Sequence, residues 1–488
     1  MVRAGRATGR RAAAALLVLG SVAGFASPVV ASPPARWDRR ILEFVRFVEK
    51  SRGLEFEHPI PVEFLDDAAF EKKVVTDDAD LTKADRALGR QYSEDLRALG
   101  LVGSDFDFNA ASSVLDAQGV VGFYDQDTKK MVIRGEDLGD TDVRVTVVHE
   151  LTHALQDQHF GLTKLQNATK SSGEDFALTT LVEGDAVWVE EDYVATLPQA
   201  EQDAYYTAAG STGADSPEGS TRATPEVGSG VDVSPILDHI FSAPYDLGYG
   251  FVDYLRSGGS TKAVDRALRH PPPSDEQVLD PVALLGHEHP VAPPVPRLEA
   301  GETRRGRSDE LGVLTLYFLL ASRLDPRTAL AAVTGWKGDA YVGFTRDDQP
   351  CIRAAIATDD PRDAKELTAA LEQWTAKGPA GAASVERNGA DVELQACARA
   401  ETALPTAQAL DDAATAVGSR YLNYGQFEAN EGLSRRDARC LADLSSTDLE
   451  LTEIFNTVAP ENATPEQEAL IEQRRREYAD ACGLRVTE

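Results

Sequence analysis

The stretch with the clearest potential for chemistry is VVHELTHALQDQHF, residues 147–160, which holds three of the chain's eight histidines. His149 and His153 are four positions apart, so on a helix they project from one face about one turn apart. Both imidazoles can then reach one zinc ion at about 2.0–2.1 Å. Glu150 can take a proton from a zinc-activated water and pass it to a leaving amine. The H-E-x-x-H spacing therefore predicts zinc hydrolase chemistry. The alternative is a surface helix with incidental histidines.

A catalytic zinc needs a third protein ligand, and two residues compete for this role. Glu183 lies among apolar residues in ALTTLVEGDAVWV, where an unpaired carboxylate is unfavourable, so we predict that it binds the metal. His159 has the spacing of a metzincin ligand, but Gln156 stands where that pattern needs a glycine. On an uninterrupted helix His159 points away from the metal, which favours a structural role. Asp185 or Glu190 would orient a histidine.

Peptide hydrolysis also needs a group that stabilises the developing oxyanion. Tyr245 and His239 are the candidates, together with Tyr249, because all three lie in one predicted helix after the metal-binding segment. The alternative for these residues is core packing, the usual role of aromatic side chains at helical spacing. The predicted hairpin at 120–135 would offer an edge strand to an extended substrate.

Hydrophobic periodicity predicts the elements that must position these residues. A strand is expected at 58–65, a hairpin at 120–135, and a loop between the two metal-binding helices at 161–173. Residues 271–307 are rich in proline and are expected to be extended. Helices are expected at 36–50, 142–160, 174–197, 236–259, 309–323 and 362–377. Strand pairs are expected within 331–360 and around the Asn388-Gly389 turn.

We predict an α+β, predominantly helical fold. Residues 32–300 would form a zincin-like catalytic domain with a small sheet and the H-E-x-x-H active-site helix. Within it, residues 208–234 are rich in Gly, Ser, Thr and Pro and are expected to form a disordered insertion. Residues 301–400 would form a small α/β segment, and 401–488 a helical C-terminal domain.

The N-terminus has the layout of a secretory signal peptide over residues 1–31. Four arginines precede an apolar run from Ala12 to about Phe25, and a small-residue cleavage site ends at Ala31. The alternative, a membrane anchor, is disfavoured because the run is short and rich in small residues, and we expect no membrane span after removal of the signal. The net charge of −31 repels phosphate backbones, so nucleic acid is not expected as a partner.

The four cysteines all lie in the last third of the chain, and none has C-x-x-C spacing. An even number of cysteines in an exported protein indicates disulfides rather than a zinc site. Of the three possible connectivities we favour Cys351–Cys397 and Cys440–Cys482, because each pair falls within one predicted segment.

The sequence also resembles a known group of enzymes. H-E-x-x-H followed by a glutamate on a second helix is similar to the gluzincin metallopeptidases, which are thermolysin-like. The closest resemblance, from about residue 50 to about 375, is to secreted, largely uncharacterised bacterial zinc peptidases. It is carried by GFYDQDTKKMVIRG, HELTHALQDQHF, LVEGDA, PYDLGYGFVDYLRSGG, PPPSDEQ and GWKGDAYVGF.

This resemblance implies that His149, His153 and Glu183 bind zinc and that Glu150 is the catalytic base. Two features depart from the pattern: the distance along the chain from His153 to Glu183 is longer than in thermolysin-like members, and Asp280 stands where a histidine is usual. We therefore expect a secreted zinc metalloendopeptidase that acts on a peptide or protein. The alternatives are an inactive zincin-like binding protein, or a zinc hydrolase of non-peptide amides or esters.

Overall fold

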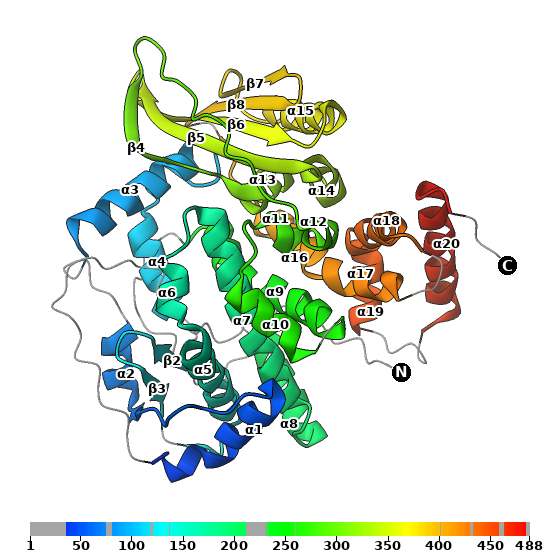
Figure 1. Ribbon diagram of the computed structural model, residues 1–488. Coiled ribbons are helices and arrows are strands. Elements are labelled where there is room, and N and C mark those ends of the chain that lie inside the picture. The colour runs from blue at the N-terminus through cyan, green and yellow to red at the C-terminus, as the bar shows by residue number, and fades with distance from the viewer. Residues whose placement is uncertain are drawn as a thin grey trace.

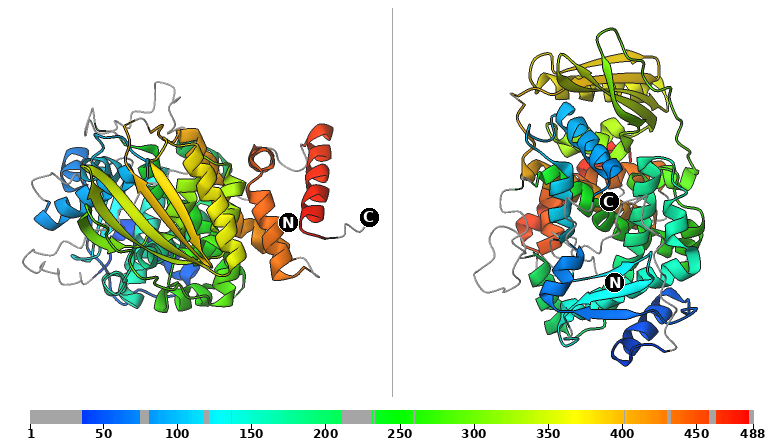
Figure 2. Two further views of the ribbon diagram at one scale, coloured as in Figure 1. Left: turned by 90° about the horizontal axis from the view of Figure 1, so that it is seen from above. Right: turned by 90° about the vertical axis from the view of Figure 1, so that its left-hand side faces the viewer.

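The computed structural model describes residues 36–74, 81–117, 121–135, 137–210, 231, 233–258, 260–400, 402–429, 433–457 and 463–484. The predicted signal peptide and residues 211–230 of the predicted insertion lie outside these residues. The fold is α+β and mainly helical, as predicted. Its two sheets lie at opposite ends of the molecule with long helices between them (Figures 1 and 2). Among the described helices, none combines the length and apolar character that crossing a membrane requires.

The smaller sheet has three strands in the order β1-β3-β2. Its members are β1 (Val62–Leu65), β2 (Gly122–Asp125) and β3 (Lys130–Arg134). β2 and β3 form the antiparallel hairpin that was predicted at 120–135, and β1 pairs with β3 in parallel. β2 is therefore an edge strand of this sheet. One face of the sheet packs against the helix that carries the histidine motif.

Four long helices lead from this sheet toward the middle of the molecule. They are α1 (Leu42–Arg52), α5 (Thr141–Phe160), α7 (Ser172–Val194) and α9 (Pro235–Ser257). α5 packs on the sheet, α1 and α7 pack against α5, and α9 packs against α7. The Asp140 side chain caps the first turn of α5, and Gly161, in the left-handed conformation, ends the helix after Phe160. The Ser171 hydroxyl starts α7 by accepting a hydrogen bond from the Glu174 amide. The connection between α5 and α7 holds one short helix, α6 (Leu162–Gln166), in place of the continuous loop expected there.

α7 and α9 pack backbone against backbone where two glycines meet. A Cβ atom on Gly248 would lie 2.6 Å from the Gly184 Cα and 2.7 Å from the Thr180 carbonyl oxygen. No rotamer change can relieve a clash with main-chain atoms, so any larger residue must push the helices apart. Gly184 is next to the predicted ligand Glu183, so this contact also fixes where α9 lies relative to the metal-binding residues.

We expect Gly248→Ala to lower the free energy of unfolding by about 1–3 kcal/mol, the usual effect of overpacking a tight contact. The matched control is Gly250→Ala on the same helix, because a Cβ there would have its nearest neighbour at 3.5 Å, an ordinary van der Waals distance. Alanine also favours a helix over glycine, so the control should be neutral or stabilising. Thermal and urea unfolding of both variants would test this, and equal destabilisation by the two would contradict it.

The larger sheet has five antiparallel strands in the order β4-β5-β6-β8-β7. They are β4 (Thr303–Asp309), β5 (Trp336–Arg346), β6 (Gln349–Thr358), β7 (Ala383–Asn388) and β8 (Asp391–Cys397). β7 and β8 form the hairpin predicted around Asn388-Gly389. The helices that pack on this sheet include α15 (Pro361–Ala376) and, from far earlier in the chain, α3 (Lys83–Ala98).

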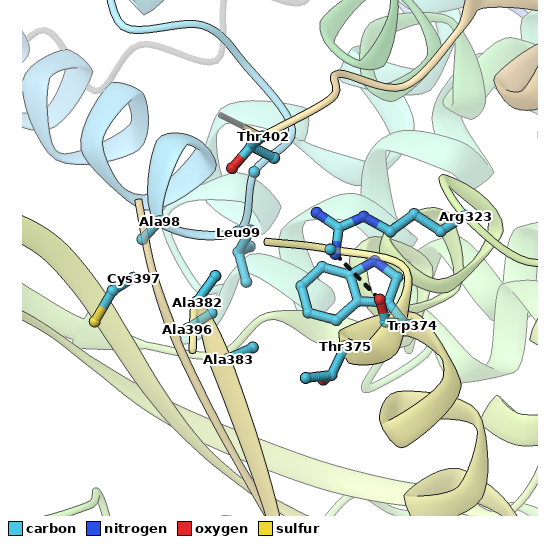
Figure 3. Close-up of a pocket in the computed structure, with 12 residues that line it drawn as sticks. Ala98, Leu99, Arg323, Trp374, Thr375, Ala382, Ala383, Ala396, Cys397 and Thr402 are labelled. Carbon is cyan, nitrogen blue, oxygen red and sulfur yellow. Dashed lines mark hydrogen bonds between the residues drawn. The ribbon is translucent and has the colours of Figure 1, made fainter. Parts of the chain in front are cut away.

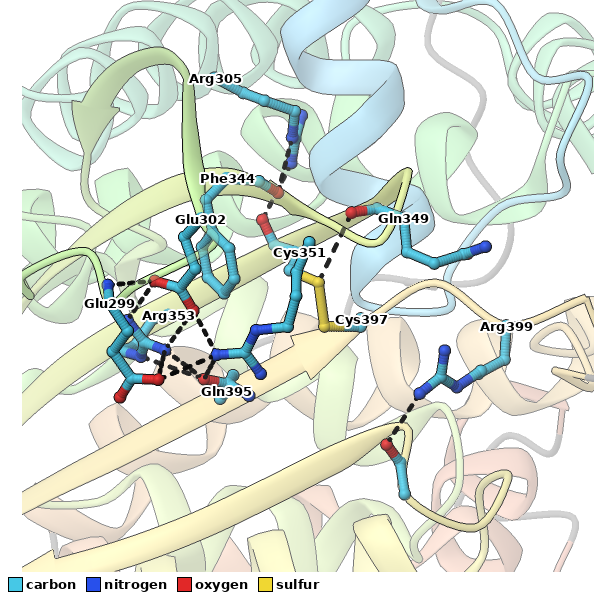
Figure 4. The surroundings of a disulfide bond; sticks show 12 residues. Glu299, Glu302, Arg305, Phe344, Gln349, Cys351, Arg353, Gln395, Cys397 and Arg399 are labelled. Carbon is cyan, nitrogen blue, oxygen red and sulfur yellow. Dashed lines mark hydrogen bonds and ion pairs between the residues drawn. A yellow bond between two sulfur atoms is a disulfide. The ribbon is translucent and has the colours of Figure 1, made fainter.

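Both disulfides have the connectivity favoured from the sequence. Cys351 and Cys397 lie directly opposite each other on β6 and β8, beside the buried ion pair of Arg353 and Glu302 (Figure 4). The second disulfide joins Cys440 of α18 (Arg435–Ser446) to Cys482, the residue directly after α20 (Pro465–Ala481). Helix α20 lies at the periphery of the molecule (Figure 2).

The C-terminal region is helical, as predicted. It also contains α16 (Ala407–Gly418), α17 (Arg420–Glu428) and α19 (Leu449–Thr457). α16 is part of the largest hydrophobic core, to which it contributes Leu410, Ala413 and Val417. Residues 407–418 therefore pack as an integral part of the middle of the molecule.

The remaining helices connect these parts. They are η1 (Arg39–Ile41), α2 (Asp67–Val74), α4 (Phe108–Ala117), α8 (Gln199–Gly210), α10 (Thr261–Arg269), α11 (Glu276–Leu279), α12 (Pro281–Gly286), α13 (Gly312–Ala321) and α14 (Pro326–Val333). The prediction that 271–307 is extended was wrong for α11 and α12. Asp280 caps α12 by accepting a hydrogen bond from the Val282 amide, and Pro281 fits the first helical position.

Candidate metal centre

The three predicted metal ligands meet between α5 and α7. His149 and His153 lie one turn apart on α5, and Glu183 faces them from the middle of α7. The Nε2 atoms of the two histidines are 3.1 Å apart. The Glu183 Oε2 atom lies 3.3 Å from the His149 Nε2 atom and 3.4 Å from the His153 Nε2 atom. All three side chains are buried.

These distances fit a small tetrahedral cation. A tetrahedral ion with bonds of about 2.0–2.1 Å separates its ligand atoms by about 3.3 Å. The three separations observed between the His149, His153 and Glu183 atoms are all close to this value. Two imidazoles and one carboxylate form a donor set that zinc accepts readily, and three protein ligands leave one position open.

The proton on the His149 ring is fixed by a neighbouring carboxylate. Its Nδ1 atom lies 3.0 Å from the Oε2 atom of Glu190, and a carboxylate can only accept a hydrogen bond. The other Glu190 oxygen accepts a hydrogen bond of 2.5 Å from the Tyr205 hydroxyl of α8. Neutral His149 therefore carries its proton on Nδ1 and directs the Nε2 lone pair toward Glu183 and His153.

The proton on the His153 ring is fixed by Gln156. The Gln156 amide nitrogen donates to the Val182 carbonyl at 3.0 Å and to the Asp185 carboxylate at 2.9 Å. Both are acceptors, so the Gln156 oxygen must face the His153 Nδ1 atom, which lies 3.0 Å away. His153 therefore also directs an Nε2 lone pair into the cluster. Two nitrogen lone pairs and a carboxylate oxygen converge, an arrangement that only a cation can satisfy.

The pKa shifts of the three ligand residues also show that the cluster favours positive charge. Burial alone lowers the pKa of His149, but hydrogen bonds to Glu183 and Glu190 raise it to well above its ordinary value. Burial likewise lowers the pKa of His153, while the Glu183 carboxylate raises it, with a net upward shift. Burial raises the pKa of Glu183, yet the two histidines bring it below its usual value. Protons and a metal ion therefore compete for the same place, and acid pH should weaken metal binding.

Glu150 is completely buried beside the cluster, with 0% of its surface exposed. Neither carboxylate oxygen accepts a well-formed hydrogen bond. Burial raises the pKa of this carboxyl above its ordinary value, while His149, His153 and the Tyr124 main chain act to lower it. A buried carboxylate without a partner is unfavourable, so Glu150 has unused capacity to hold a proton.

The edge strand β2 approaches Glu150 through the Tyr124 main chain, and side chains of its hairpin contact the end of α5. The Tyr124 hydroxyl donates to the Asp157 Oδ2 atom at 2.8 Å, and the same atom forms an ion pair of 2.6 Å with Lys129 of the hairpin turn. Both contacts hold the hairpin against the C-terminal part of α5. Gly122 adds to the close fit, because a Cβ atom there would lie 2.9 Å from the Thr146 side chain on α5.

The other predicted site residues lie at different distances from the cluster. The Tyr245 ring of α9 stacks beside the His149 ring, with 6.4 Å between centroids and 28° between planes. His239 contacts Asp411 of α16 at 3.1 Å and stacks on Phe318 of α13. The half-buried His159 has its Nε2 atom 2.8 Å from the Glu55 carbonyl oxygen and is not one of the three grouped ligands. This placement agrees with the structural role predicted for His159.

A small cavity lies elsewhere, where the end of α3 meets β7, β8 and α15 (Figure 3). Its volume is about 10 Å³, which is room for one water molecule. The Arg323 guanidinium covers the Trp374 ring at one side of it, 4.1 Å from the ring centroid. This cavity is too small for a substrate and holds no group with catalytic potential.

Three residues that support the metal ligands were not predicted from the sequence. Gln156 was noticed only as a departure from a glycine, whereas it orients His153. Tyr205 lies in α8 and Arg52 in α1, and no local pattern marks either as a neighbour of the cluster. The buried Arg52 pairs with Asp185 at 2.8 Å. Arg52 could have been recognised from the sequence only as an arginine on the buried side of α1.

Comparison with known proteins gives one partial match. A family model described as a domain of unknown function (DUF8575) matches residues 299–417, from just before β4 to the last turn of α16. The match covers the five-stranded sheet and none of the metal-centre residues. No curated protein and no solved structure matches the chain significantly. The comparisons therefore assign no chemistry to this centre.

Proposed function

We propose that the chain is an exported zinc metallopeptidase of the gluzincin type. In this proposal His149, His153 and Glu183 hold the zinc ion. Support comes from the separations of their ligand atoms and from the hydrogen bonds that direct both histidine lone pairs into one point. The two disulfides favour an oxidising compartment, in agreement with the N-terminal signal expected from the sequence.

The single observation that carries a catalytic role is the state of Glu150. A purely structural zinc site would need the three ligands but not an additional carboxylate, buried beside them, whose oxygens accept no well-formed hydrogen bond. Such a group suits a general base, because burial raises its pKa above the ordinary value of a glutamate. Bound zinc would supply a Lewis acid that acidifies water and polarises a carbonyl group.

Three parts of the chain would then have separate roles in peptide hydrolysis. Glu150 would accept the proton of the attacking water and return it to the leaving nitrogen. Tyr245, which stacks beside His149, is a better candidate than His239 for stabilising the oxyanion, since His239 is engaged with Asp411. The edge strand β2, whose Tyr124 main chain acts on Glu150, would pair with an extended peptide.

Metal analysis and hydrolysis together test this proposal. We expect residues 32–488, purified without added chelator, to contain about one zinc per chain. The protein should cleave fluorescein-labelled casein, lose this activity with a chelator, and regain it when zinc is returned. No zinc after loading would contradict the metal site. Zinc without cleavage of casein or of simple esters would favour the inactive binding protein, and cleavage of esters alone would favour the non-peptide hydrolase.

A further inference from the structure

A buried ion-pair network connects the metal centre to the N-terminal helix. Arg52, the last residue of α1, is 1% exposed. Its Nε atom lies 2.8 Å from the Asp185 Oδ2 atom, and its Nη2 atom lies 2.9 Å from the Asp265 Oδ1 atom of α10. A buried arginine is tolerated when carboxylates neutralise it, and here the two carboxylates come from two other helices.

The same Asp185 oxygen serves both Arg52 and the metal centre. Asp185 Oδ2 accepts the hydrogen bond from the Gln156 amide nitrogen at 2.9 Å. Gln156 in turn fixes the His153 ring from its Nδ1 side. Three consecutive contacts therefore lead from Arg52 to a predicted metal ligand, all of them between buried groups.

The two histidines are supported in different ways. His149 has a carboxylate, Glu190, directly on its Nδ1 atom, whereas His153 has the neutral amide of Gln156. An amide can turn by 180° and exchange its oxygen for its nitrogen. In the turned orientation Gln156 would donate to the His153 Nδ1 atom, so the ring proton would move to Nε2 and block metal binding. The orientation of Gln156 therefore decides whether His153 is a ligand.

Asp185 holds Gln156 in the competent orientation, and Arg52 holds Asp185. Without the guanidinium, Asp185 would be a buried carboxylate without its cation, which is strongly unfavourable. Asp185 would then no longer be fixed in place from the side of α1, and its hold on the Gln156 amide would weaken. The Val182 carbonyl alone would then oppose the turned orientation.

We propose that Arg52 is a positioning residue for the metal centre: through Asp185 and Gln156 it fixes His153 as a ligand, so that docking of α1 and binding of the metal stabilise each other. This inference rests on the proposed metal site. Because coupling between two binding events is reciprocal, zinc should also tighten the docking of α1. The N-terminal helix thereby becomes part of the metal centre although it supplies no ligand.

The test compares Arg52→Gln with Arg420→Gln. Arg420 is also buried, at 2% exposed, and also pairs with an aspartate, Asp443 at 2.6 Å, but it lies on α17. Both variants should unfold at lower temperature than the unaltered protein. Only Arg52→Gln should bind zinc about 10–100-fold more weakly in competition with a chelator, the usual effect of losing an outer partner of a ligand. Its cobalt(II) form should show an altered visible spectrum.

Amide hydrogen exchange tests the reciprocal effect. Zinc should slow exchange in α1 of the unaltered protein, with α15 as an internal reference, and this slowing should disappear in Arg52→Gln. Arg52→Lys should recover part of the zinc affinity, because an ammonium restores the charge but cannot bridge two carboxylates. If Arg52→Gln does not fold, Asp185→Asn removes the same ion pair and should weaken zinc binding in the same range.

The outcomes separate the two proposals. An unaltered protein that takes up no zinc overturns both the metal site and this inference. Zinc bound by the unaltered protein and equally well by Arg52→Gln or Asp185→Asn, with an unchanged cobalt spectrum, overturns the inference alone. Equal weakening by Arg420→Gln also overturns it, because the effect would then follow general stability.

Discussion

Glu150→Gln is expected to retain zinc and to lose turnover by about 10²–10⁴-fold, the usual contribution of a general base. Glutamine has the shape of glutamate but its amide cannot accept and return a proton. Glu150 is not one of the three grouped ligand residues, and both its oxygens lack a well-formed hydrogen bond, so the substitution leaves the metal ligands and the surrounding packing intact. Zinc content by mass spectrometry and the rate of casein cleavage would be measured on the same sample.

A matched control for this variant is Glu276→Gln. Glu276 is a buried acid of α11, and burial with its acidic neighbours raises its pKa to about 9. It is therefore already protonated at neutral pH, where the neutral glutamine side chain resembles it. This control should keep both zinc and activity. Loss of zinc from Glu150→Gln would show that Glu150 is a ligand, and full activity of that variant would remove it from the chemistry.

The sequence predicted those parts of the centre that depend on local spacing. His149 and His153 share a helix face, so their convergence follows from the helical repeat alone. Glu183 was marked by a carboxylate in an apolar helix, and the structure brings it to the same point. The hairpin at 120–135 and the turn at Asn388-Gly389 were also predicted from local patterns and were confirmed.

Contacts between distant segments could not be predicted in this way. Arg52 and Asp185 are 133 positions apart, and nothing near either residue identifies the other. The parallel pairing of β1 with β3 and the packing of α3 on the larger sheet likewise depend on tertiary arrangement. Residues 271–307 were predicted to be extended because they are rich in proline. Pro281, however, occupies the first turn of α12, where proline favours a helix.

Glu183→Ala and His159→Ala should separate the two possible third ligands. Removing the Glu183 carboxylate takes away both a ligand atom and the negative charge that holds a cation between the two histidines. We expect this variant to lose stoichiometric zinc. His159→Ala should keep one zinc per chain, because the His159 ring contacts the Glu55 main chain and is not grouped with the three ligand residues. The reverse result would favour a metzincin-like ligand set.

Stability in a chelator gives this comparison a second readout. Metal bound to the folded state alone adds to its stability, by about 2.7 kcal/mol when free zinc is at 100 times its dissociation constant. Removing zinc from the unaltered protein and from His159→Ala should therefore lower the melting temperature. Glu183→Ala should melt at the same temperature with or without the chelator, since it has no metal to lose. If neither zinc nor chelator changes the melting temperature of the unaltered protein, protons alone must satisfy the converging lone pairs of His149 and His153.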